Sequence, residues 1–249
     1  MSFLNRIALA IMLLAPYYSA VVCAEDPENP NTTKSVNTGA IVFARIRSLL
    51  SSQSCSSEAA SSKWMKNYIH DTKQFGKDLE RMLPLLDYVS QQADKKSLPG
   101  EFVLIPFVES RYIPSATAKG GPAGLWQMMP NTAKHFGVVN SKGHDGRYSA
   151  VHSTNAALNY LNQLHNEFKH WPTAVMAYNT GDSRMRILLK RQGLSEADAH
   201  QRLPTGLAAH TYAYVRKLEA LSCFMLEPER FNMSLPLDVE FKPLRAKQQ

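Results

Sequence analysis

Residues 82–112 read MLPLLDYVSQQADKKSLPGEFVLIPFVESRY, and their apolar side chains are spaced as in helices. Before residue 90 these side chains recur at intervals of three and four, which predicts one buried helix face. The Pro99-Gly100 pair ends this helix. Residues 101–110 then predict a second, mostly buried helix whose last turn carries the acid Glu109. The apolar face of the first helix comprises Leu79, Met82, Leu83, Leu86 and Val89.

The same periodicity continues toward the C-terminus. No stretch alternates apolar and polar residues, as a half-buried strand does, for more than four residues. The sequence therefore predicts an all-α fold in one compact domain. Further helices are expected near residues 130–133, around 156–164 with Ser153 or Thr154 as its cap, and over 171–178, 182–191 and 208–224.

Composition divides the chain into four segments. Residues 1–24 have the charged start, short apolar core and small-residue exit of a secretory signal peptide. Residues 25–62 are rich in Ser, Pro and Asn and predict a disordered linker. The helical domain is expected over residues 63–230, and a C-terminal tail over 231–249.

The predicted signal peptide indicates export. Its apolar stretch is shorter than the roughly 20 residues that a membrane-spanning helix needs. Cleavage after Ala24 is the favoured interpretation, and an uncleaved membrane anchor is the first alternative. A lipoprotein is disfavoured because Val22 precedes Cys23, where lipoprotein signals have a small residue.

Two cysteines remain after such cleavage, Cys55 and Cys223. In an oxidising compartment they can pair, and the bridge would tie the N-terminal segment to the last predicted helix. The alternative is two unrelated thiols, with Cys223 a small core residue beside Phe224. Neither cysteine has a second ligand at metal-binding spacing, so no metal site is expected.

The net charge of +7 and the pI near 9.3 suggest an acidic partner. The sequence has no arginine-rich run, zinc-finger spacing or RNA-binding signature, so nucleic acid is not expected. A basic surface serves an anionic polymer such as a cell wall equally well. Nucleotide-binding loops, the serine-hydrolase elbow and the zinc-protease motif are absent too, and no cofactor is expected.

Glu109 is the remaining candidate for chemistry. A carboxyl group at the end of an apolar helix is partly desolvated, which raises its pKa toward the range that a general acid needs. The alternative is a surface glutamate, or one bonded to a nearby backbone amide. These residues alone leave both interpretations open.

Three motifs around Glu109 carry more information together. Glu109-Ser110, the run GLWQMMP at 124–130 and the run AYNTG at 177–181 follow one another in this order. Together they resemble the lytic transglycosylase domain related to goose-type lysozyme, and the run at 82–112 is most similar to the membrane-bound lytic transglycosylase D branch. The resemblance covers about residues 79–221 and implies a compact lysozyme-like helical fold.

The resemblance implies a role for each matched residue. Glu109 would be the single catalytic acid that protonates the glycosidic oxygen and then acts as base. Two matched positions depart from the usual pattern: Ala118 stands where relatives often carry a serine that contacts substrate, and Arg216 replaces a proline. The implied substrate-binding residues are Ser110, Gln127, Met129, Tyr160, Tyr178, Asn179 and Tyr214.

The implied reaction cleaves the β-1,4 bond between N-acetylmuramic acid and N-acetylglucosamine in peptidoglycan and closes a 1,6-anhydro ring. Such a reaction needs no second carboxylate to activate water, and Asp145 and Asp182 are typical of turns or caps. A hydrolytic muramidase of the same fold and a non-catalytic wall-binding or secretion-scaffold protein are the alternatives. The resemblance implies a monomer in the periplasm of a Gram-negative bacterium, with a cell-wall or secretion-machinery protein as a further partner.

Overall fold

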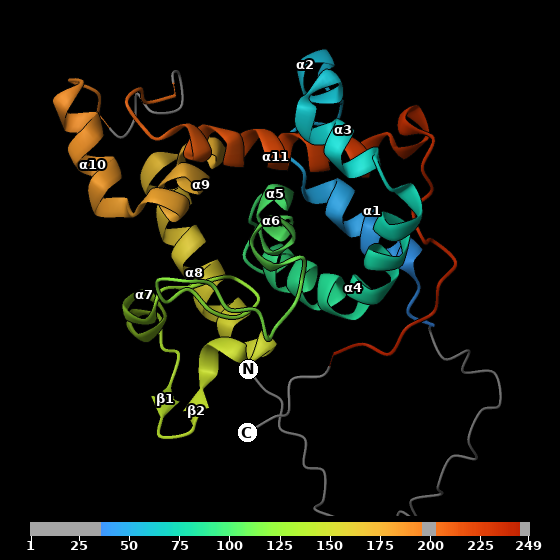
Figure 1. The fold of residues 1–249 in the computed structure, drawn as a ribbon, viewed down its shortest axis with the longest axis horizontal. Coiled ribbons are helices and arrows are strands. Elements are labelled where there is room, and N and C mark those ends of the chain that lie inside the picture. The colour runs from blue at the N-terminus through green and yellow to red at the C-terminus, as the bar shows by residue number, and fades with distance from the viewer. Residues whose placement is uncertain (1–35, 196–202, 245–249) are drawn as a thin grey trace, which may run out of the picture. The chain divides into compact units, whose positions relative to one another are not determined.

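A computed structural model describes residues 36–195 and 203–244 of the chain. Within them the regular secondary structure is helical apart from one two-stranded hairpin, and the all-α prediction is confirmed (Figure 1). The predicted signal peptide, residues 1–24, lies outside the described residues. None of the described helices is both long and apolar enough to cross a bilayer.

The described elements follow one another in this order: α1 Gly39–Leu49, α2 Ser57–Ser61, α3 Lys63–Ile69, α4 Thr72–Asp94, α5 Gly100–Val103, α6 Ile105–Ser110, α7 Pro130–His135, β1 Asn140–Ser141, β2 His144–Asp145, the 3₁₀ turn η1 Gly146–Tyr148, α8 Ala150–Phe168, α9 Trp171–Thr180, α10 Asp182–Arg191, α11 Ala209–Leu226 and the 3₁₀ turn η3 Pro228–Phe231.

The linker prediction is wrong for the part of residues 25–62 that the structure describes. Helix α1 buries Val42, Phe43 and Ile46 completely and packs on α4 and α5. The Arg45 guanidinium also donates to the buried Asp87 carboxylate, with 2.9 Å between Nη1 and Oδ1. Burial of three large apolar side chains explains why this short segment is helical despite its polar surroundings.

The tail predicted from residue 231 is also part of the domain up to residue 241. Met233 and Leu235 are buried. The amide of Ala40 donates to the carbonyl of Leu237 over 2.8 Å, and the amide of Phe241 donates to the carbonyl of Asn37 over 3.0 Å. The start of α1 and the segment after η3 therefore hold each other in place.

The helix expected over residues 101–110 is two short helices, α5 and α6, with the break at Leu104. Pro106 explains the break, because it has no N–H to donate and its ring clashes with the carbonyl four residues earlier in a continuous helix. In Figure 1, α5 and α6 lie in the middle of the fold, and they contact α4 and α11.

Helix α11 runs along one side of the fold and connects distant parts of the chain. It packs against α9 as well as against α1, α2 and α3 (Figure 1). A disulfide joins its Cys223 to Cys55, with 4.7 Å between the Cα atoms, so α11 is also bonded to the segment between α1 and α2. The position of α11 is thus set by packing on both sides and by a covalent bond.

Helix α8 begins earlier than the sequence predicts. Its cap is Ser149, whose hydroxyl accepts from the amide of His152, and the prediction of Ser153 or Thr154 is wrong. Both residues lie inside the helix and are fully buried. The Thr154 hydroxyl accepts instead from the indole N–H of Trp126 over 3.0 Å, which fixes the Trp126 side chain against α8.

Candidate active site

Glu109 lies in the last turn of α6, which ends where Arg111 adopts a left-handed conformation with φ of 52°. The next residue, Ser110, is buried, and its hydroxyl donates to the carbonyl of Leu125 over 2.7 Å. Ser110 therefore fastens α6 to the loop 113–129. Ser110 does not line the cleft described below.

A cleft of about 490 Å³ opens beside Glu109. Six of the predicted site residues meet there from four separate parts of the chain: α6, the loop 113–129, α8 and the end of α9. The cleft is lined by Glu109, Ala118, Pro122, Gln127, Met128, Met129, Thr132, Tyr160, Tyr178, Asn179, Thr180, Gly181 and Asp182.

The environment of Glu109 favours its protonated form. Burial raises the pKa of this carboxyl to about 7. Two smaller effects oppose burial: the hydrogen bond from the Tyr214 hydroxyl, 2.6 Å from Oε1, and the positive charge of Lys217 both lower the pKa. Near neutral pH the group is therefore divided between acid and carboxylate, as proton donation followed by proton acceptance requires.

A second buried acid, Glu101, shows by contrast what a structural carboxylate looks like in this fold. Burial raises its pKa too. Both of its oxygens, however, accept hydrogen bonds from Ser51, from the backbone amide at 3.0 and 3.3 Å and from the hydroxyl at 3.1 Å. Glu101 joins α5 to the end of α1, whereas Glu109 accepts a hydrogen bond from Tyr214 and faces an open cleft.

The tyrosines divide into two kinds. Tyr160 and Tyr178 line the cleft with their ring centroids 5.6 Å apart, and the Tyr178 hydroxyl donates to the Trp126 carbonyl over 2.8 Å. Tyr214, on α11, is buried behind Glu109 and does not line the cleft. Burial raises the pKa of all three hydroxyls, that of Tyr160 to about 12, so they remain proton donors.

Asn179 lines the cleft at the end of α9. Its side-chain carbonyl accepts from the Thr211 hydroxyl over 3.0 Å. Since Thr211 is on α11, this bond holds the end of α9 against the helix that also supplies Tyr214.

The loop 113–129 is held in a shape that only glycine permits at one position. Gly124 has φ of +79°, and a Cβ atom there would lie 1.9 Å from the carbonyl oxygen of Arg147. Three residues later Gln127 is also left-handed, with φ of 46°, and its side-chain amide donates to the carbonyls of Ala116 and Gly124. Gln127 and the half-exposed Met129 are thereby presented to the cleft.

Arg147 supports this loop and was not identified from the sequence. Its guanidinium donates to the carbonyls of Gly121 and Met128, over 2.6 and 3.0 Å, and forms an ion pair with Asp145. Asp145 also caps η1, as its turn-like sequence context predicts. These two contacts join Arg147 to backbone carbonyls that lie 26 and 19 positions earlier in the chain. No side-chain motif in the sequence reveals such contacts.

Asp182 is the other carboxylate in the cleft, and its sequence context is typical of a cap or turn residue. It is the first residue of α10 and lines the cleft. Its Oδ2 accepts from Arg186 over 2.8 Å, and Arg186 also bonds Glu167. Asp182 is thus paired with a cation inside its own helix.

No group of three or more His, Cys, Asp or Glu side chains suited to a metal ion occurs in residues 36–195 and 203–244. The side chains that line the cleft offer carboxyl, hydroxyl and amide groups. One acid with a pKa near neutrality, in a groove lined by aromatic and amide side chains, fits acid–base cleavage of a polar polymer.

Comparison with known proteins agrees with this arrangement. Residues 87–201, which include Glu109 and every residue lining the cleft, match the transglycosylase SLT domain family. The chain carries a transglycosylase SLT domain. The resemblance seen in the sequence is thereby confirmed, together with the lysozyme-like helical fold that it implied.

Individual relatives of the SLT domain are known. The chain is 33% identical over 181 residues to membrane-bound lytic murein transglycosylase D of Escherichia coli K12. The aligned residues make up 72% of this chain and 38% of that protein. It is 35% identical over 83 residues to peptidoglycan transglycosylase gp16 of Escherichia phage T7, covering 32% of this chain and 6% of that protein. The chain thus spans well under half the length of either relative.

Proposed function

We propose that this protein is a peptidoglycan lytic transglycosylase. It would cleave the β-1,4 bond between N-acetylmuramic acid and N-acetylglucosamine and leave 1,6-anhydromuramic ends. The observation that carries the proposal is Glu109, a carboxyl group with a pKa of about 7 that faces the cleft of an SLT domain. The names of the relatives, which describe murein and peptidoglycan transglycosylases, support the same substrate.

In the first step, protonated Glu109 would donate its proton to the glycosidic oxygen as the bond to C1 of the muramic acid breaks. The carbonyl oxygen of the N-acetyl group would stabilise the positive charge that develops at C1. The ionised Glu109 would be stabilised by the Tyr214 hydroxyl and by the charge of Lys217, which both lower its pKa.

In the second step, the Glu109 carboxylate would accept the proton of the sugar's own 6-hydroxyl while O6 bonds to C1. The proton count closes, since Glu109 ends the cycle protonated and no water is consumed. The step needs no second carboxylate to activate water. Asp182, the other acid of the cleft, is already paired with Arg186, which suits this assignment.

Product analysis tests the proposal directly. Purified sacculi digested with the protein should yield muropeptides one water lighter than the products of hydrolysis, as measured by mass spectrometry. Products with reducing ends would instead identify a hydrolytic muramidase, with Asp182 the first residue to test as its base. Sacculi left intact by the folded protein would favour the wall-binding or scaffold alternative.

Tyr214→Phe should change the pH dependence of cleavage. Loss of the hydroxyl removes a hydrogen bond that lowers the pKa of Glu109, so this pKa should rise. The alkaline limb of the rate profile should move to higher pH, and the maximal rate should fall about tenfold, because the carboxylate formed in the first step loses a donor. Initial rates on soluble murein fragments across the pH range measure both effects.

Tyr212→Phe is the matched control for this variant. Tyr212 lies on the same helix, but its hydroxyl donates to the carbonyl of Pro204. Its removal should leave the pH profile in place. An unchanged profile in Tyr214→Phe as well would show that the Tyr214 hydrogen bond does not tune Glu109.

The predicted signal peptide and the membrane-bound relative support export to the periplasm of a Gram-negative bacterium. A monomer, with a cell-wall or secretion-machinery protein as a further partner, remains part of the proposal.

A further inference from the structure

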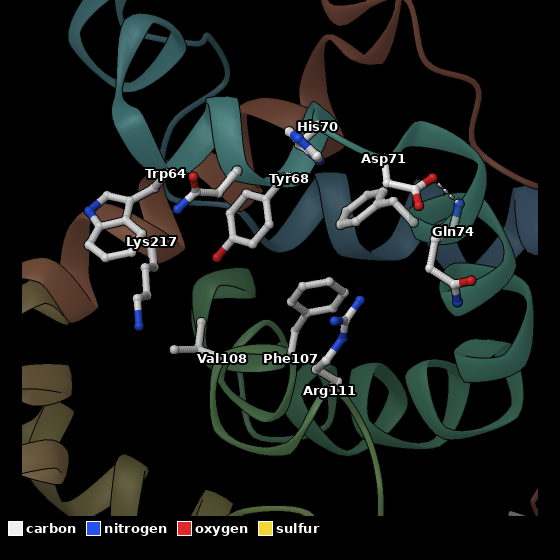
Figure 2. A pocket seen from close by; sticks show the side chains of 11 residues that line it. Trp64, Tyr68, His70, Asp71, Gln74, Phe107, Val108, Arg111 and Lys217 are labelled. Atoms are coloured by element: carbon white, nitrogen blue, oxygen red, sulfur yellow. Dashed lines mark hydrogen bonds between the residues drawn. The ribbon is translucent and has the colours of Figure 1, made fainter.

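A second pocket of about 450 Å³ lies on the neighbouring face of the helix that carries Glu109. Phe107 and Val108, which directly precede Glu109 on α6, form one wall, and Trp64 and Tyr68 of α3 form the opposite one (Figure 2). Lys217 of α11 completes it beside the Trp64 ring. We call this the Trp64 pocket.

Two walls of the Trp64 pocket lie outside the part of the chain that matches the SLT domain family. That match spans residues 87–201, whereas α3 precedes it and Lys217 follows it. The contacts of α3 with α4 and α11 hold these walls in place. The pocket is therefore built partly from residues beyond the segment that the family match covers.

The pocket is positively charged where it approaches Glu109. The Lys217 ammonium lies 4.8 Å from the centroid of the Trp64 ring and, within the described residues, makes no ion pair. Arg111 also lines the pocket, although its guanidinium is bonded to Asp78. The pocket's one carboxylate, Asp71, accepts from the backbone amide of Gln74 over 2.9 Å.

This arrangement suits an anion better than a neutral sugar. A sugar ring would bind by stacking on a face of the indole. Two ammonium groups already lie over the Trp64 ring, Lys217 at 4.8 Å and Lys63 at 5.0 Å from its centroid. An incoming carboxylate would leave the aromatic wall as it is and pair with the ammonium of Lys217.

The geometry points to an acidic peptide as the ligand of the Trp64 pocket, namely the stem of the glycan strand held at Glu109, with a carboxylate of the stem bound to the Lys217 ammonium. This inference rests on the proposed function. In peptidoglycan the negative charge lies on the peptides, and each peptide is attached to a muramic acid, the sugar whose bond would break at Glu109. A cationic pocket on the adjacent face of α6 is placed to receive it.

Occupancy of the pocket would affect the acid itself. The charge of Lys217 lowers the pKa of Glu109. A bound carboxylate would offset that charge, so the pKa of Glu109 would rise when a peptide-bearing strand is in place. The acid would then be protonated more fully on strands that carry a peptide than on strands that lack one.

Calorimetric titration of the full chain tests the inference without turnover. In a Glu109→Gln background, the free stem tripeptide of murein should bind, and adding Lys217→Gln should weaken its binding about fivefold, as expected for loss of one partly exposed ion pair. Lys66→Gln is the matched control, because Lys66 is an exposed lysine of α3 that does not line the pocket. It should leave the affinity unchanged, while the tripeptide with amidated carboxylates should bind about fivefold more weakly.

Equal affinity of the Lys217→Gln and Lys66→Gln variants would overturn the inference, as would the absence of tripeptide binding. Displacement of the tripeptide by an N-acetylglucosamine oligomer would also overturn it, because the pocket would then be a sugar site. If the tripeptide binds through Lys217 while the unmodified protein leaves sacculi uncleaved, the proposed function fails and the peptide pocket stands.

Discussion

Glu109→Gln should lower the rate of glycan cleavage by about 10³-fold or more, since proton transfer by a positioned side chain contributes about 10²–10⁴-fold and Glu109 would serve both steps. Glutamine has nearly the same shape and still accepts the hydrogen bond of Tyr214, but it cannot donate a proton to the leaving oxygen. The measurement is the release of soluble muropeptides from purified sacculi.

The stability of the same variant provides its control. Burial raises the pKa of Glu109 from 4.5 to about 7, so the ionised form is disfavoured in the folded state. The protonated carboxyl makes its full contribution to stability below pH 4.5, and this contribution is lost as the pH rises through about 7. Above pH 7, the neutral variant should therefore be more stable than the unmodified protein by about 1–3 kcal/mol, after allowance for solvent screening of the half-buried side chain.

Urea unfolding at pH 5 and at pH 8 measures this difference. An inactive variant that is equally or more stable at pH 8 shows that chemistry, and not folding, was lost. Full sacculus-clearing activity in Glu109→Gln would contradict the catalytic assignment and favour the scaffold alternative.

Removing the disulfide should have the largest effect on stability. Cys55 and Cys223 are 168 positions apart. In the chain-entropy treatment, closing a loop of this length lowers the conformational entropy of the unfolded chain and destabilises it by about 4–5 kcal/mol. The Cys55→Ser, Cys223→Ser double variant should lose about that much free energy of unfolding, as measured by urea denaturation under oxidising conditions.

Reduction of the unmodified protein gives an independent measurement, because it removes the same constraint without a substitution. The reduced protein and the double variant should have similar midpoints of urea denaturation. A double variant as stable as the oxidised protein would mean that the contacts of α1, α2 and α3 with α11 fix this region without the bond.

Local sequence pattern predicted most of the helices, and it failed where the stabilising contact is distant. Residues 182–191 form α10 with the predicted bounds, because charged and apolar residues alternate there with helical spacing. The linker prediction failed over α1 because Ser, Asn and Pro dominate the surrounding composition. Three buried side chains of α1, supported by contacts with α4 and with residues 237–241, outweigh that composition.

In the candidate site, too, local motifs were predictive and distant contacts were not. Motif order led to Glu109, Gln127 and Tyr178, and all three line the cleft. Two other matched residues, Ser110 and Tyr214, act from behind the cleft surface. Arg147 and Lys217 were missed because their partners are backbone carbonyls, an aromatic ring and a long-range charge, none of which has a sequence signature.

The pairing of residues 37–40 with residues 237–241 has a consequence for how the domain is attached to anything else. Thr38 and Glu240 form an antiparallel bridge, so the chain enters and leaves the folded domain at one point. Modules with this property can be inserted into, or suspended from, another structure through a single connection. An attachment upstream of residue 36 and one downstream of residue 244 would therefore hold the domain by the same face and leave it free to turn about that one point.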